Sequence, residues 1–154
     1  MRRRRLLTLF LVQALVASVG AMECEKQPFD RMDQKATVIF SGTVSKRVSV
    51  DGGAAACDKR SAEKPDCGAK VATFKVNKVW KGKPSRMLKV FSEDACSCLG
   101  SYFKIGDEYL VFAVPPTPER PGIYNANNVC YGTQLISDPA AQEIVERLNA
   151  KYSR

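Results

Sequence analysis

The amino-acid sequence predicts a mainly β domain, namely a five-stranded Greek-key barrel of the OB type that is stabilised by disulfides and followed by a C-terminal α-helix. Three observations indicate this fold class. Alternating apolar and polar residues mark several short strands. An apolar stripe at helical spacing marks residues 138–152. Six cysteines, an even number, follow a segment that resembles a secretory leader.

Residues 1–21 have the composition of a signal peptide. A positively charged start, Arg2 to Arg5, precedes an apolar run over residues 6–19, and Ala21 ends a stretch of small residues suited to cleavage. This run of 14 residues is shorter than the roughly 20 needed to span a bilayer. We therefore expect an exported protein, extracellular or periplasmic, whose mature domain covers residues 22–154 and has no integral membrane segment.

Alternation from Lys35 to Val50 predicts the first strand, and Gly42 in its middle suggests a bend or bulge. One face would carry Ala36, Val38, Phe40, Gly42, Val44, Val48 and Val50. Further strands are predicted at 71–80, 87–91, 109–114 and near 123–126. The second would place Ala72, Phe74, Val76 and Trp80 on one face, and the fourth is apolar on both faces and so the most buried.

The predicted helix begins at Asp138, a residue type that caps helix N-termini, and Pro139 suits the first helical position because it lacks an N–H. Its apolar stripe consists of Ile144, Val145, Leu148 and Tyr152.

The six cysteines predict three disulfides in an exported chain of this size. They are Cys24, Cys57, Cys67, Cys96, Cys98 and Cys130. A metal site is the competing interpretation, but the chain has no histidine, and zinc sites usually show two-residue spacers or histidine partners. We therefore expect neither a metal nor a cofactor. Local closure of Cys57 with Cys67 would leave the other four cysteines to form two bridges.

Enzymatic function is not expected, and no catalytic residue is assigned. Without histidine the usual general base and every Ser-His or Cys-His pair are missing. The carboxylate pairs Glu93-Asp94 and Asp107-Glu108 are adjacent in sequence, so on a strand they would point to opposite faces. A thiol-disulfide role for Cys96 and Cys98 is the remaining alternative in this class.

Residues 36–44 (ATVIFSGTV) resemble the first strand of the netrin-like domain, which also forms the inhibitory half of the tissue inhibitors of metalloproteinases. The similarity continues through Phe74–Val76, Val79–Gly82, Phe103–Gly106 and Tyr109–Ala113, and it extends from Cys24 to Leu148. It implies an OB-type barrel, export, disulfides and a protein-binding role. It also suggests a second disulfide arrangement, in which Cys24 pairs with Cys130. Cys57 and Cys67 would then reach Cys96 and Cys98, because a bridge between Cys96 and Cys98 would be strained.

This resemblance implies a partner-binding edge, and the most specific function it implies is inhibition of a metalloendopeptidase. The residues of this edge are Met22, Glu23, Cys24, Ala95, Cys96 and Ser97. The inhibitors begin with a Cys-x-Cys pair whose terminal amine chelates the protease zinc. Here Cys24 fits the second cysteine and Met22 stands at the first, so cleavage after Ala21 leaves no zinc-chelating cysteine amine.

Charge suggests a second partner class. The chain has 24 basic and 16 acidic residues, and after loss of four leader arginines the mature chain keeps a net charge of +4. No acidic residue occurs from Cys67 to Ser92, a stretch that contains Lys70, Lys75, Lys78, Lys81, Lys83, Arg86 and Lys89. Lys75, Lys78, Lys81 and Lys83 are candidates to bind an anionic polysaccharide or envelope surface. The competing interpretation is a solvated face whose lysines discourage edge pairing. Nucleic acid is not expected, because the strand aromatics fall on core faces.

Overall fold

The computed structural model describes residues 27–50, 69–92, 103–126 and 132–153. The predicted leader, all six cysteines and the predicted partner-binding edge lie outside these ranges. The described elements are α1 (Phe29–Lys35), β1 (Val38–Ser49), β2 (Lys70–Lys81), β3 (Met87–Ser92), β4 (Glu108–Val114), β5 (Tyr124–Ala126), β6 (Gln134–Leu135) and α3 (Pro139–Tyr152).

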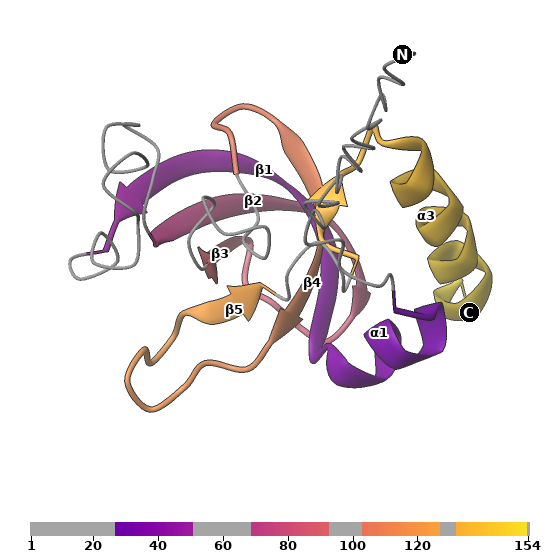
Figure 1. Cartoon of the computed structure of the whole chain (residues 1–154), viewed down its shortest axis with the longest axis horizontal. Coiled ribbons are helices and arrows are strands. Elements are labelled where there is room, and N and C mark those ends of the chain that lie inside the picture. Colours follow the sequence, from indigo (N-terminus) through magenta and orange to yellow (C-terminus); the bar gives the residue numbers. More distant parts are fainter. Residues whose placement is uncertain (1–26, 51–68, 93–102, 127–131, 154) are drawn as a thin grey trace, which may run out of the picture.

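Five strands close into a barrel in the order β1-β2-β3-β5-β4, with β4 pairing back to β1 (Figure 1). The pairings are antiparallel except for the short parallel contact of β3 with β5. The mainly β fold with a closed five-stranded barrel and a C-terminal helix is therefore confirmed, and the arrangement is OB-like. The two-residue strand β6, which pairs with β4, was not predicted from the sequence.

Aromatic side chains fill the barrel interior. Phe74 lies fully buried at its centre and makes edge-on contacts with the rings of Phe40, Phe103 and Tyr109, at centroid distances of 5.5, 4.9 and 6.4 Å. Edge-to-face geometry of this kind stabilises aromatic pairs beyond the area they bury. The described side chains thus form a packed core inside the barrel.

A second apolar layer lies between the barrel and both helices, which sit on the same side of the sheet (Figure 1). Strand β4 is apolar on both faces because Val111 points into the barrel, whereas Leu110 and Phe112 point toward the helices. Helix α3 begins as predicted, with the Asp138 carboxylate accepting a hydrogen bond from the Ala140 N–H at 2.9 Å. Of its two fully buried residues, Ala141 and Leu148, the second belongs to the predicted stripe. The seven-residue helix α1 was not predicted.

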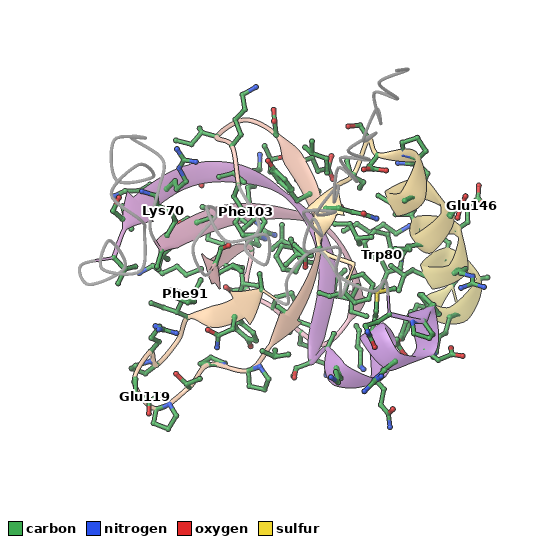
Figure 2. The ribbon with its side chains drawn as sticks, in the orientation of Figure 1. Lys70, Trp80, Phe91, Phe103, Glu119 and Glu146 are labelled. Atoms are coloured by element: carbon green, nitrogen blue, oxygen red, sulfur yellow. The ribbon has the colours of Figure 1, made fainter. Side chains whose placement is uncertain are left out.

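Bulges between β1 and β2 change two predicted face assignments. The register shifts at three points, and one of them lies at Gly42, where an added Cβ would come 2.9 Å from the Lys75 carbonyl oxygen. The predicted irregularity at Gly42 is therefore confirmed. The shift after Val44 places Val48, 44% exposed, outside the barrel, so its predicted place on the core face is wrong. Similarly, Trp80 packs in the helix layer and not beside Phe74 (Figure 2).

Candidate functional site

The four candidate lysines of the β2–β3 region occupy different environments. Lys81 is engaged within the protein: its ammonium group donates a hydrogen bond to the Asp33 carbonyl oxygen at 2.5 Å and lies 3.9 Å from the Asp33 carboxylate. The contact joins the end of β2 to α1. Lys81 therefore has an internal anionic partner, 48 residues earlier in the chain.

Asp33 itself is the centre of a charged cluster that fastens both helices to the barrel. Its carboxylate accepts hydrogen bonds from the Lys151 ammonium at 2.8 Å and from the Tyr152 hydroxyl at 2.6 Å. Burial raises the pKa of Asp33, but the hydrogen bonds from Lys151 and Tyr152 and the charge of Lys81 outweigh it, so the pKa is lowered. Burial, followed by the bond to Asp33, raises the pKa of Tyr152 to about 12. These contacts join α1, the end of β2 and the end of α3.

Lys78 also has a contact inside the protein, although its side chain is exposed. Its ammonium group donates to the Asn149 side-chain oxygen at 2.7 Å and lies 5.1 Å from the centre of the Trp80 ring. The Trp80 indole N–H donates to the same Asn149 oxygen at 2.8 Å. The side-chain amide of Asn149 on α3 therefore binds both Lys78 and Trp80 of β2.

Lys75 and Lys83 are exposed. Lys83 lies in the turn between β2 and β3, whereas Lys75 lies in the middle of β2, on the outer side of the barrel, because its neighbour Phe74 points inward. Lys75 is paired with Thr43 of β1 and with Met87 of β3. Only Lys75, of the four candidates, therefore projects from the middle of the three-stranded outer surface.

The strand register places two further lysines beside Lys75. Lys46 of β1 and Lys89 of β3 are both paired with Thr73, which lies two residues before Lys75 on the same face of β2. All three lysines are exposed. Lys46 was not among the candidates, because the bulge between Val44 and Lys46 decides which residue it faces, and alternation alone does not reveal a bulge.

We call this outer surface, defined by Lys46, Lys75 and Lys89 around Thr73, the basic face. Strands β1, β2 and β3 contain no acidic residue. Its boundary on the β4 side is Glu108, which is paired with Thr43. The basic face is thus a convex sheet surface of one charge sign with an acidic border.

A cavity of about 230 Å³ lies elsewhere, between α1 and α3. Phe29, Met32 and Ile144 provide apolar walls, and the Arg147 guanidinium lies 5.6 Å from the Phe29 ring centre. Its lining is mixed, because Gln27, Gln134, Glu143 and Arg147 also border it.

Residues 27–50, 69–92, 103–126 and 132–153 hold no group of three or more His, Cys, Asp or Glu side chains placed to bind a metal ion. Asp107 forms an ion pair with Lys104 at 3.8 Å. None of the helices that the structure describes is both long and apolar enough to cross a membrane.

Comparison with known proteins gives no assignment: no protein family matches this chain, and no curated protein is significantly similar to it.

Proposed function

We propose that this chain is an exported, non-enzymatic binding module with a disulfide-stabilised, netrin-like OB barrel, and that it binds a protein partner, with a metalloendopeptidase as the first candidate. The supporting observation is the architecture. The strands form a barrel in the order β1-β2-β3-β5-β4, and a helix follows them. An OB-type barrel is the fold implied by the resemblance of residues 36–44 and Tyr109–Ala113 to the netrin-like domain.

The proposed partner-binding edge consists of Met22, Glu23, Cys24, Ala95, Cys96 and Ser97. Both segments adjoin anchored parts of the barrel. The N-terminal segment leads to α1, which the Asp33 cluster ties to β2 and α3. The other segment follows Ser92, which is 3% exposed and pairs with Lys70. Binding residues carried by a rigid scaffold lose less conformational freedom when a partner binds.

Binding to purified zinc endopeptidases tests this proposal. The oxidised protein beginning at Met22 should bind at least one of them without being cleaved and without cleaving it. Ala95→Arg combined with Ser97→Arg should weaken binding about tenfold or more, because two long charged side chains would enter a desolvated contact. A matched control, Gln34→Arg with Ser153→Arg, adds the same charge at exposed positions of α1 and after α3 and should bind like the parent.

Acetylation of the N-terminal amine should leave inhibition unchanged, because Met22 and not a cysteine is expected there. Inhibition abolished by acetylation would show a zinc-chelating terminus after all. Binding that is unaffected by the double arginine variant would place the contact elsewhere, and absence of binding to every endopeptidase would reject this partner class.

A second candidate function is favoured by a separate observation. The basic face carries three exposed lysines on strands without an acidic residue. This supports binding of an anionic glycan or envelope surface through charge complementarity.

A further inference from the structure

We propose that the basic face binds a linear anionic polysaccharide chain through Lys46, Lys75 and Lys89. This inference rests on the second candidate function and assigns its site. The site expected from the sequence consists of lysines that lie close together along β2 and the turn after it. The site proposed here consists of three lysines on three different strands, which the register of the barrel brings together.

Sheet geometry fixes the spacing of the three charges. Lys89 is paired with Thr73 and Lys75 lies two residues further along β2, so these lysines are diagonal neighbours, roughly 7 Å apart. Lys46 is paired with Thr73 from the other side. It therefore lies two strand spacings from Lys89, or roughly 10 Å. The three Cβ atoms form a triangle on one surface, small enough for one polymer segment to reach all three ammonium groups.

These separations are close to the screening length of about 8 Å at physiological ionic strength. Each ammonium group therefore attracts an anionic group that binds beside its neighbours, whereas charges farther away are screened. Glu108 lies on the opposite side of Thr43 from Lys75, so it borders the face without standing between the lysines. A polymer with repeated charges can satisfy several ammonium groups at once, which a single small anion cannot.

The groups between the lysines favour a sugar chain over a nucleic acid. The Thr43 hydroxyl accepts a hydrogen bond from the Asn77 amide at 3.0 Å, and Thr73 lies between Lys46 and Lys89. Hydroxyl and amide groups therefore lie beside the lysines, together with the side chain of Met87, which is 51% exposed and paired with Lys75. Sequence-tolerant binding of single-stranded nucleic acid relies on aromatic rings on which bases stack. The nearest outer aromatic ring, that of Phe91, is buried and covered by the Arg120 guanidinium 3.6 Å from its centre.

Heparin, a sulfated linear polysaccharide, is a suitable probe, with neutral dextran as the uncharged comparison. The full mature protein should bind heparin, and increasing salt should weaken the binding. Replacing Lys46, Lys75 and Lys89 with glutamine should reduce affinity about tenfold or more, since several weak surface contacts are lost together. Each substituted side chain is exposed, so the variant should retain the parent's thermal unfolding midpoint.

The matched control removes the same number of charges elsewhere: Arg31→Gln on α1, Lys83→Gln in the β2–β3 turn and Arg147→Gln on α3, all exposed. It should lose less than about threefold in affinity. Equal losses in the two triple variants would show attraction to net charge alone and overturn the site, as would parent-like binding by the variant of the basic face.

Vesicles of phosphatidylserine distinguish a polysaccharide from a membrane surface. Tighter binding to these vesicles than to heparin, lost in the basic-face variant, would contradict the polysaccharide assignment. Endopeptidase binding should be unchanged in that variant, because the partner-binding edge consists of other residues. The failure of one proposal therefore leaves the other testable.

Discussion

Replacing Phe74 with alanine should lower the free energy of unfolding by about 3–5 kcal/mol. The side chain is fully buried, and three aromatic neighbours contact its ring edge-on, at centroid distances down to 4.9 Å. Strand β2 cannot move inward to fill the cavity, because β1 and β3 hold it on both sides. Urea unfolding of the oxidised protein, followed by near-ultraviolet circular dichroism, measures the change.

Val79→Ala is the control for this loss, because Val79 lies on the same strand but is 41% exposed. We expect a change within about 0.5 kcal/mol there. A loss below about 1 kcal/mol for Phe74→Ala would mean that the aromatic cluster is not the core of the barrel.

Replacing Asp33 with alanine should cost about 2 kcal/mol at neutral pH, because Tyr152 and Lys151 each lose a hydrogen bond to a charged acceptor. The side chains of Lys81 and Lys151 are 30% and 46% exposed, so both can be hydrated once the carboxylate is gone. Because water can solvate these ammonium groups, the loss of stability should be smaller than for breaking a fully buried ion pair. Tyr152→Phe removes only the hydroxyl donor and should cost about 1 kcal/mol.

The pH dependence gives this cluster a distinct signature. The pKa of Asp33 in the folded protein is below its ordinary value of 3.8. At a pH between these two values, the unfolded chain therefore binds more protons at Asp33 than the folded chain does. The stabilisation by Asp33 should be complete above pH 3.8 and should disappear as the pH falls through the folded pKa. Conversely, the pKa of Tyr152 is raised from 10.0 to about 12, so its contribution should be lost between these values as the pH rises. Equal pH profiles for the parent and Asp33→Ala would contradict this account.

Strand positions followed from the sequence where local patterns decide them. The alternation of β1 up to Val44 and the two-sided apolar character of β4 predicted both strands to within a few residues. Asp138 and Pro139 likewise marked the start of α3, because capping depends on adjacent residues. In contrast, α1 has seven residues, too few for a periodic signal, and it depends on tertiary contacts of Met32 and Asp33.

The composition of the basic face depends on information that a single sequence does not carry. Bulges in β1 and β2 moved Val48 and Trp80 to other faces, and the same register places Lys46 beside Lys75. Lys81 and Lys75 lie in the same lysine-rich stretch of the sequence, but Lys81 contacts Asp33, which lies 48 positions earlier in the chain. Charge counting therefore located the basic region, whereas only pairing between strands shows which of its lysines share a face.

Intact-mass and peptide-mapping measurements on the exported protein, made without reduction, test the central claim most directly: that this is an exported, disulfide-stabilised binding domain. Met22 should be the first residue. The mass should be lower than that of the reduced chain by six hydrogen atoms, one for each cysteine. A peptide joining Cys57 to Cys67 would establish local closure, whereas one joining either of them to Cys96 or Cys98 would make the segment that contains Cys57 and Cys67 part of the proposed edge. Two or more free thiols, or an uncleaved leader, would contradict the account.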